Sequence, residues 1–482
     1  MSATGEFIET EKLRGIVNDA GTVFQECHRL LCRRVGHDEP GKFLSFQSRL
    51  AKAIYSLEHE IIRLKQRERE LARDKKTIPA PEVAKRFRDL HAHIEALKNA
   101  IDHGKVIGDA FAWLFYGEEE DLIRSHYAHP PIEHIPVGVG GMGEIEFVGK
   151  VPKLGSHLVL YHGTTTFLRV GDVSLLNLKT SRIDGIAELK SKKISEGQMQ
   201  VSAHYLGRKI SLPAATVRQQ SGSAHRKEVG DRLCSIIDRQ TKGIEAALKK
   251  AGNPPVNLLG VGSPGLHFDC QHLTALYDEA SLETASTAHV SPGLMLVGIK
   301  LPVTNLAERV LNDRAIDAQR VVSVIGQEAK NIMQPEVTKN SLQIGFLIFP
   351  GHGRYALTMG MTPVVWWPVR ADVVEAIVGG KFMIMTLFNP AHLIDRFQRR
   401  GFIVTSDTPA RGFKLRAQKG DGMLTFHGLD FFLSLIPHDL ITEDSVHDTV
   451  CSIIDDILTR PLTRSTRIDL QMSFRNANRK SR

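Results

Sequence analysis

The strongest constraint on the fold of this chain is a pair of apolar series with helical spacing in residues 43–105. The first series consists of Leu50, Ile54, Leu57, Ile61, Leu64 and Leu71, and the second of Val83, Phe87, Leu90, Ile94, Leu97 and Ile101. Alternating steps of three and four place these side chains on one stripe of a helix. The Pro-containing link KKTIPAP separates the series, so we expect an antiparallel, coiled-coil-like hairpin. Such a hairpin either packs on the rest of the protein as a helical layer or grips a partner or second copy.

Helices are also expected on both sides of this hairpin, which makes residues 1–129 a helical region. Residues 6–36 carry apolar side chains at helical spacing, and an acidic run after Gly117 suits the start of another helix. Residues 130–156 contain prolines and the Gly-rich run VGVGGMGEIEF. This run lacks the Lys-Ser/Thr ending of a phosphate-binding loop and leads into a predicted strand, so we expect a flexible linker there.

The composition indicates a globular protein with an excess of basic residues. A chain of 482 residues with 42% hydrophobic residues can bury a large core. Its net charge of +8 is compatible with an acidic partner such as nucleic acid. Its five cysteines include no C-x-x-C pair, which argues against a disulfide framework or a zinc site. Because the chain has no apolar run of about 18 residues and no signal-peptide pattern, we expect a cytoplasmic protein that does not enter the membrane.

Residues 161–193 combine strand-like alternation with charged positions that packing does not require. Asp172 opens the run Val173–Leu175, and the run IAELK places Glu188 and Lys190 two residues apart. Side chains two apart on a strand share a face, so this carboxylate and this ammonium should project together. We expect strands at 157–162, 166–177 and 183–190, and a further one at MQVSAHYL. Pairing of these strands would bring Asp172 to the same sheet edge.

Two carboxylates and one cation at a sheet edge suit a divalent metal ion over a phosphodiester. Hydrolysis of this bond needs an activated water, neutralisation of charge on the phosphate oxygens and a stabilised leaving oxygen. Asp172 and Glu188 are the expected metal ligands, with the backbone carbonyl of Leu189 as a third, and Mg²⁺ or Mn²⁺ is the expected ion. Lys190 would orient the attacking water or offset the transition-state charge.

The residues GDVSLL, followed after a turn by IAELKSKK, resemble the core of PD-(D/E)xK nucleases, in which an Asp opens one strand and E-x-K lies in the next. The resemblance covers residues 157–255. It implies a mixed four-stranded, restriction-endonuclease-like sheet flanked by helices, dependence on Mg²⁺ and a nucleic-acid substrate, with DNA favoured. It places Asp172, Glu188 and Lys190 in the three catalytic positions.

The same resemblance assigns a further catalytic position on the helix that follows the catalytic strands. We expect that helix at about 227–251, where Gln240, beside Arg239, matches it. The chain departs from the family at two points: Gly171 stands where a Pro commonly precedes the Asp, and Ile244 stands where exonuclease branches have a Tyr.

Two alternatives start from other features of the chain. The run LVLYHGTTT resembles the His-Gly-Thr strand of ADP-ribosyltransferases, which would make His162 the residue that holds the NAD ribose. A hydrogen-bonded core histidine is the other interpretation of His162. A non-catalytic protein that binds nucleic acid or a partner through the helical hairpin and a basic tail is the second alternative, and it predicts no metal-dependent activity.

The remaining chain alternates predicted strands and helices over 256–460, which indicates an α/β region. Residues 461–482 carry six basic residues against one Asp and form a basic tail. The expected architecture is therefore α/β: a helical N-terminal hairpin, a restriction-endonuclease-like core and a C-terminal α/β region. We expect a cytoplasmic, metal-dependent nuclease acting on nucleic acid, with the hairpin as a candidate homo-oligomer contact. A role in defence against foreign DNA is a hypothesis suggested by a nuclease core with unfamiliar flanking regions.

Overall fold

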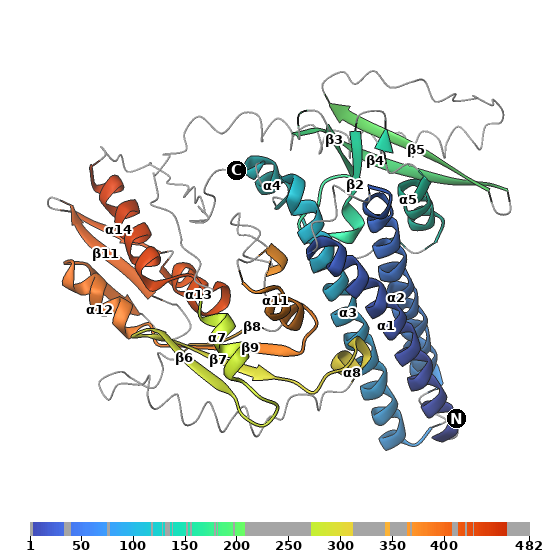
Figure 1. The fold of residues 1–482 in the computed structure, drawn as a ribbon, viewed down its shortest axis with the longest axis horizontal. Coiled ribbons are helices and arrows are strands. Elements are labelled where there is room, and N and C mark those ends of the chain that lie inside the picture. Colours follow the sequence, from blue (N-terminus) through green and yellow to red (C-terminus); the bar gives the residue numbers. More distant parts are fainter. Residues whose placement is uncertain are drawn as a thin grey trace. The chain divides into compact units, whose positions relative to one another are not determined.

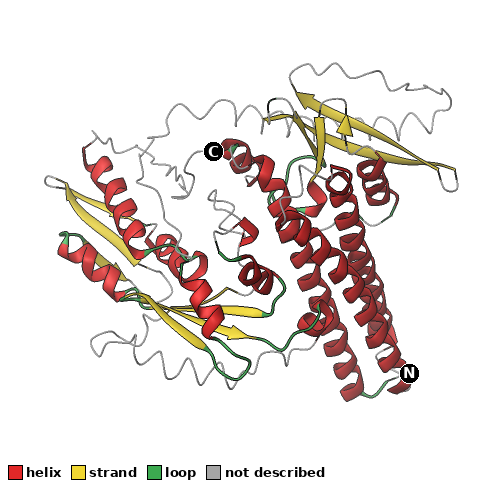
Figure 2. Cartoon of the chain, viewed as in Figure 1, coloured by secondary structure: helices red, strands yellow, loops and turns green. Residues whose placement is uncertain are grey.

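The structure of the chain is a computed structural model that describes residues 3–207, 271–311, 343–347 and 364–459, apart from 33–39, 75–77, 117–118, 128, 131–134, 137, 151–152, 155–156, 178–179, 181, 196–197, 367–368, 407–412, 420–421 and 428. The chain divides into two compact units, residues 1–255 and 256–482. Each unit combines helices with antiparallel sheets (Figures 1 and 2). The expected combination of helices and sheets is confirmed. A mixed sheet is not found in the described residues, because every strand pair there is antiparallel.

Three long helices form an arm in unit 1. They are α1 (Ala3–Cys32), α2 (Pro40–Asp74) and α3 (Ala80–Tyr116), which run side by side (Figure 1). His91 of α3 bonds Glu68 of α2 at 2.7 Å, and Gly104 of α3 lies against Ile54 of α2. Residue numbers therefore rise along one helix as they fall along the other, which confirms the antiparallel hairpin. All six residues of the first apolar series are buried.

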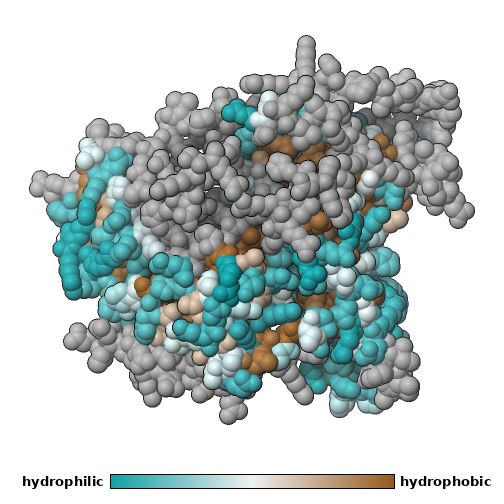
Figure 3. All heavy atoms as spheres, viewed as in Figure 1, coloured by the Kyte–Doolittle hydropathy of each residue, from teal (hydrophilic) through white to brown (hydrophobic). Residues whose placement is uncertain are grey.

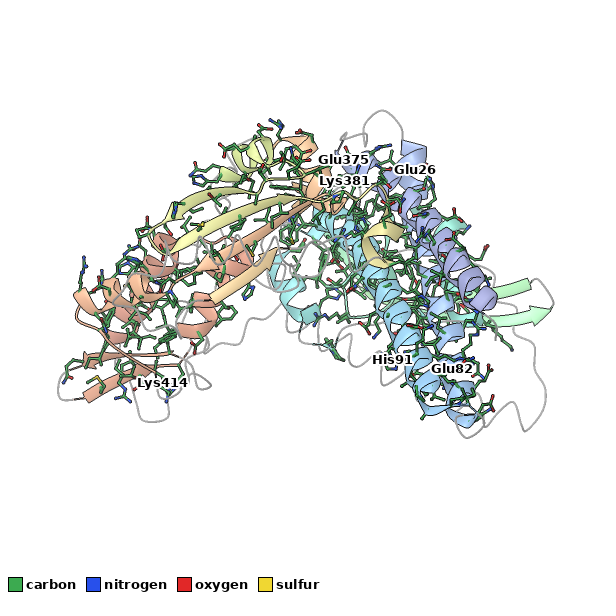
Figure 4. All side chains as sticks on the ribbon, turned by 90° about the horizontal axis from the view of Figure 1, so that it is seen from below. Glu26, Glu82, His91, Glu375, Lys381 and Lys414 are labelled. Carbon is green, nitrogen blue, oxygen red and sulfur yellow. The ribbon has the colours of Figure 1, made fainter. Side chains whose placement is uncertain are left out.

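The arm is less buried at the end where α2 and α3 connect. Val83, Phe87 and Leu90 of the second apolar series are only partly buried, whereas Ile94, Leu97 and Ile101 are buried. Glu82 and His91 lie on this outer part of α3 (Figure 4). The described surface of the arm is largely hydrophilic in the view of Figure 3. The outer part is therefore a solvated helical pair, and the inner part belongs to the core of unit 1.

The segment expected to be a flexible linker is instead partly helical. After α4 (Glu120–Tyr127), which begins in the acidic run as expected, α5 spans Val139–Lys150 and contains the Gly-rich run from Val139 onwards. Gly143 packs directly against Ser191 and Val201 of the sheet, where a Cβ atom would collide. The prediction of a linker and strand was wrong because these glycines permit close contact between a helix and a sheet.

The sheet of unit 1 has five strands in the order β1-β2-β3-β4-β5. The strands are β1 (Lys153–Leu154), β2 (His157–Tyr161), β3 (Val173–Asn177), β4 (Arg182–Ser195) and β5 (Gln198–Gly207). The strand predicted at 166–177 begins only at Val173, because residues 162–172 form the 3₁₀-helix η1 (His162–Thr164) and a loop. Tyr161 pairs with Val173, and Val173 with Ala187.

Unit 2 contains two smaller antiparallel sheets. The first has the order β6-β7-β9-β8, with β6 (Ser286–Ser291), β7 (Leu294–Lys300), β8 (Gln343–Leu347) and β9 (Phe382–Phe388). The second has β10 (Ile403–Ser406), β11 (Phe413–Lys419) and β12 (Gly422–Phe426). The helices in the described part of unit 2 are α7 (His272–Glu279), α8 (Leu306–Leu311), α11 (Ala371–Val378), α12 (Ala391–Arg399), α13 (Leu429–Asp439) and α14 (Glu443–Thr459).

The core of the first sheet in unit 2 follows from strand alternation. Alternate residues of β7 and β9 gather in one cluster, formed by Met295, Val297, Ile299, Met383, Met385 and Leu387. The segment TPVVWWPV is not a strand where it is described, because Val364–Trp366 form the 3₁₀-helix η3. No described helix has the length and apolar character needed to span a lipid bilayer. The basic tail lies outside the described residues.

Candidate active site

Asp172 is fixed against β4 at the point where β3 begins. Its backbone N–H donates to the carbonyl of Ala187 at 2.8 Å, and its carboxylate Oδ2 accepts the N–H of Leu189 at 2.6 Å. The first bond extends the pairing of β3 and β4 by one residue. In the second bond, the Asp172 side chain takes the place of a backbone carbonyl as the acceptor for β4. Asp172 therefore lies beside the stretch of β4 that carries Glu188 and Lys190.

The glycine before Asp172 has a conformational role. Gly171 has a φ of +68°, in the left-handed region. A proline cannot adopt this angle, because its ring holds φ near −65°. A Cβ atom at this position would lie 2.6 Å from the Cγ2 of Ile186 and 2.8 Å from the carbonyl oxygen of Ala187. The turn that presents Asp172 thus requires glycine and excludes proline.

Glu188 and Lys190 project from the same face of β4, as the two-residue spacing predicted. The Lys190 Nζ donates to Glu188 Oε1 at 2.6 Å. The side chains are 26% and 14% exposed for Lys190 and Glu188, respectively. The pair is therefore screened less than a surface ion pair and remains accessible from solvent.

Helix α5 adds a carboxylate that the sequence analysis missed. Glu144 is 7% exposed, and its Oε2 accepts the phenolic O–H of Tyr161 at 2.8 Å. Tyr161 is the last residue of β2 and is 1% exposed. In the sequence, Glu144 stands out only by its place in the Gly-rich run. Its position near Asp172 depends on the packing of α5 against the sheet, which the sequence does not reveal.

Neighbouring carboxylates shift the pKa values of Asp172 and Glu144. Burial, followed by the charges of Glu144 and Glu188, raises the pKa of Asp172 to about 7, against the N–H of Leu189 and the charge of Lys190. Burial first, and then the charges of Glu188 and Glu58, raise the pKa of Glu144, while Tyr161 and Lys190 lower it. Mutual repulsion of this kind requires that the groups lie within electrostatic reach of one another.

Helix α2 connects the arm to the same region. Gln47 donates from Nε2 to the carbonyl of Val159 and accepts the N–H of Tyr161 at Oε1, both at 2.7 Å. Because β1 is only two residues long, this side-chain amide takes the place of a neighbouring strand along the edge of β2. About three turns further along α2, Glu58 is 2% exposed and accepts the N–H of Ile135 at 3.0 Å. The arm is therefore built into the wall of the site.

The charge pattern suits a divalent cation, although the side chains are not gathered around one. Within the described part of the chain, no three His, Cys, Asp or Glu side chains are arranged as a metal site. The charge of Glu188 nevertheless acts on Asp172, and these two carboxylates are hard oxygen donors whose repulsion a cation would relieve. Leu189 directs its N–H at Asp172, and its carbonyl faces the same side, because both groups of a strand residue point to one neighbour. By donor type, Asp172, Glu188 and the Leu189 carbonyl match the oxygen ligands that Mg²⁺ or Mn²⁺ prefers.

His162 is a core residue. It is 0% exposed, and burial lowers its pKa to about 4, so the ring is neutral. Its Nδ1 donates to the carbonyl of Gly171 at 3.0 Å, and its Nε2 accepts the hydroxyl of Ser174 at 2.6 Å. Tyr116 donates to the same Ser174 oxygen at 2.5 Å. These bonds engage both ring nitrogens of His162 and hold the Gly171 turn in place.

Gln240 and Arg239, with the helix predicted at 227–251, lie outside the described residues. The structure therefore brings together Asp172, Glu188, Leu189 and Lys190 of the predicted site, and adds Glu144 and Tyr161. Comparisons with protein-family models, curated proteins and solved structures find no match to this chain.

Proposed function

We propose that the chain is a metal-dependent nuclease that hydrolyses phosphodiester bonds of nucleic acid, with DNA favoured, through a PD-(D/E)xK-like core in unit 1. The observation that carries the proposal is the bond from the Leu189 N–H to the Asp172 carboxylate. This bond places Asp172 against the strand that carries Glu188 and Lys190. The PD-(D/E)xK pattern requires this proximity, and the alternation of residues along one strand cannot produce it by itself.

Each residue of the site has a role in this proposal. Asp172 and Glu188, with the Leu189 carbonyl, would hold Mg²⁺ or Mn²⁺, and Glu144 would add negative charge from the neighbouring helix α5. When bound, such an ion offsets negative charge on the phosphate and leaving oxygens. Lys190 would stabilise charge on the non-bridging phosphate oxygens, and its contact with Glu188 keeps the ammonium at the carboxylate cluster. Tyr161 and Gln47 position Glu144 and the end of β2.

The proposed core differs from the expected family arrangement in its described sheet. That sheet has five antiparallel strands, whereas the resemblance implied a mixed four-stranded one. The proposal therefore rests on the local hairpin that carries Asp172, Glu188 and Lys190. The helix that the sequence predicts around Gln240 lies outside the described residues.

A cleavage assay tests the proposal directly. The full chain is incubated with plasmid DNA, linear duplex DNA, single-stranded DNA and RNA in Mg²⁺, Mn²⁺ or EDTA. We expect cleavage that EDTA abolishes and that falls by roughly 10²-fold or more in Asp172→Asn and in Lys190→Ala. Lys98→Ala is the matched control, because Lys98 bonds Glu95 on the exposed arm.

Two results would overturn the proposal. One is the absence of cleavage on every substrate and with either ion. The other is equal cleavage by wild type, Asp172→Asn and Lys190→Ala, which would point to a contaminating nuclease. Circular dichroism of each variant separates loss of fold from loss of chemistry.

A further inference from the structure

The β4–β5 ribbon extends well beyond the rest of the sheet. β3 pairs with β4 only as far as Val173 opposite Ala187, whereas β4 and β5 remain paired out to Ser195 opposite Gln198. Figure 1 shows these two strands extending past β2 and β3. Seven residues of strand beyond Glu188 correspond to roughly 20 Å. The site therefore lies at the base of a protruding two-stranded ribbon.

One face of this ribbon is covered and the other is open. On the covered face, Ser191 donates to the carbonyl of Gly140 in α5 at 3.3 Å, and Gly143 packs against Ser191 and Val201. On the open face, Lys192 follows Glu188 and Lys190 at the two-residue spacing of a strand, and it is exposed. Ser202 and His204, which stand opposite Lys190 and Glu188, are exposed as well. The open face thus continues directly from the site.

The charge of the ribbon complements a polyanion. Residues 189–204 contain three lysines, of which Lys190 and Lys192 share the open face by strand alternation, and a single acidic residue, Glu196. Ser202 and His204 add hydrogen-bonding groups next to the lysines, and their side chains lie 3.4 Å apart. Cationic and polar side chains in a row that leads into a carboxylate site are suited to a phosphate backbone that runs across it.

The shape and composition of the β4–β5 ribbon distinguish between duplex DNA, duplex RNA and single strands as ligands. The major groove of B-form DNA is about 12 Å wide and admits a two-stranded β-ribbon. The major groove of A-form RNA is too deep and narrow to be read by side chains. Proteins that bind single strands stack bases on aromatic side chains, and residues 189–204 contain no Phe, Tyr or Trp. Duplex DNA is therefore the substrate class that the ribbon fits.

We infer that the β4–β5 ribbon enters the major groove of duplex DNA with Lys192, Ser202 and His204 towards the DNA, and so guides a backbone phosphate to Asp172 and Glu188. This inference rests on the proposed nuclease function and names its substrate. Lys192 contacts phosphate, and Ser202 and His204 lie closest to the base edges or sugar-phosphate next to the cleavage point.

Binding to a non-cleaving variant tests the inference. The full chain with Asp172→Asn is titrated with a labelled DNA duplex, each of its single strands and an RNA duplex of the same sequence, over a series of salt concentrations. We expect the DNA duplex to bind most tightly. Adding Lys192→Ala should weaken duplex binding roughly 5- to 10-fold at 0.1 M salt and reduce the salt-dependence slope by about 0.9, the effect of one lost phosphate contact. Lys98→Ala should change neither quantity.

Groove preference is measured on the same duplex. Methylation of guanine N7, which projects into the major groove, should interfere with binding, whereas a minor-groove ligand should not compete. The inference is wrong if Lys192→Ala behaves like Lys98→Ala, if single strands or RNA bind as tightly as the duplex, or if only the minor-groove ligand competes. Because cleavage is scored with wild type and binding with Asp172→Asn, failure of the nuclease proposal and failure of the ribbon inference are separate results.

Discussion

Replacement of Gly171 by alanine should destabilise unit 1 and disable the site at the same time. Gly171 has a φ of +68°, and its carbonyl accepts the ring N–H of His162. It immediately precedes Asp172, whose backbone and carboxylate both bond β4. A side chain at this turn therefore acts on the position of the Asp172 carboxylate without removing any catalytic group.

The expected cost has two parts. A left-handed backbone costs a residue other than glycine about 1–2 kcal/mol. The new Cβ would lie 2.6 Å from Ile186 and 2.8 Å from the Ala187 carbonyl, and relieving such overpacking costs about 1–3 kcal/mol. The sum is a loss of roughly 2–5 kcal/mol in the free energy of unfolding. Displacement of the carboxylate by about 1 Å should reduce cleavage by about 10²-fold.

Urea unfolding and single-turnover cleavage measure the two effects. The control is Gly138→Ala in the same unit, because Gly138 also has a positive φ, of 115°, but no atom lies within 4 Å of a Cβ built there. Gly138→Ala should lose only the free energy of unfolding that the positive φ costs an alanine, and it should cleave at the wild-type rate. If Gly171→Ala is no less stable than Gly138→Ala and cleaves within about twofold of wild type, the turn does not position Asp172 and the reasoning fails.

Three further predictions concern neighbouring buried groups. Tyr161→Phe removes the donor to Glu144 and should cost about 1–2 kcal/mol in urea unfolding, with weaker cleavage; an unchanged midpoint would show that the bond contributes nothing. Asp109 is 1% exposed, and burial raises its pKa from 3.8 to about 7. As pH rises, the Asp109 carboxyl of the unfolded chain loses its proton at a lower pH than that of the folded chain. The stability that the protonated carboxyl contributes is therefore complete below about pH 4 and falls by up to about 4 kcal/mol as pH rises to about 7. Asp109→Asn should flatten that dependence in urea titrations at each pH, and parallel curves for the two proteins would contradict it. His162→Gln should destabilise by about 1–3 kcal/mol, because two buried bonds lose a partner. NAD should leave the melting temperature of wild type unchanged, and a rise that the variant abolishes would support a nucleotide contact instead.

Local periodicity predicted the parts of this fold that depend on neighbouring residues in the sequence. The three-and-four spacing of Leu50 to Leu71 predicted a buried helical stripe, and the structure confirms it. The two-residue spacing of Glu188 and Lys190 predicted a shared face, and their 2.6 Å contact confirms it. Both patterns require only the geometry of one helix or one strand.

The same local rules failed where glycine served a contact between distant segments. The run around Gly143 read as a linker, because glycine lowers helix propensity. In the folded chain this glycine is the contact surface of α5 against Ser191 and Val201. In the sequence, Gly171 is a departure from the PD-(D/E)xK pattern, which commonly has a proline before the Asp. In the structure, its positive φ excludes proline at this position.

The sequence by itself determined which residue types could do the chemistry and which of them share a face. Only the tertiary structure decided that Asp172 bonds the strand of Glu188 and that Glu144 of α5 lies within electrostatic reach of Asp172. It also decided that Gln47, more than a hundred residues before Val159 and Tyr161, completes the edge of β2. These contacts arise because folding satisfies buried backbone and carboxylate groups with whichever partner the packing brings near, and sequence spacing carries no record of that partner.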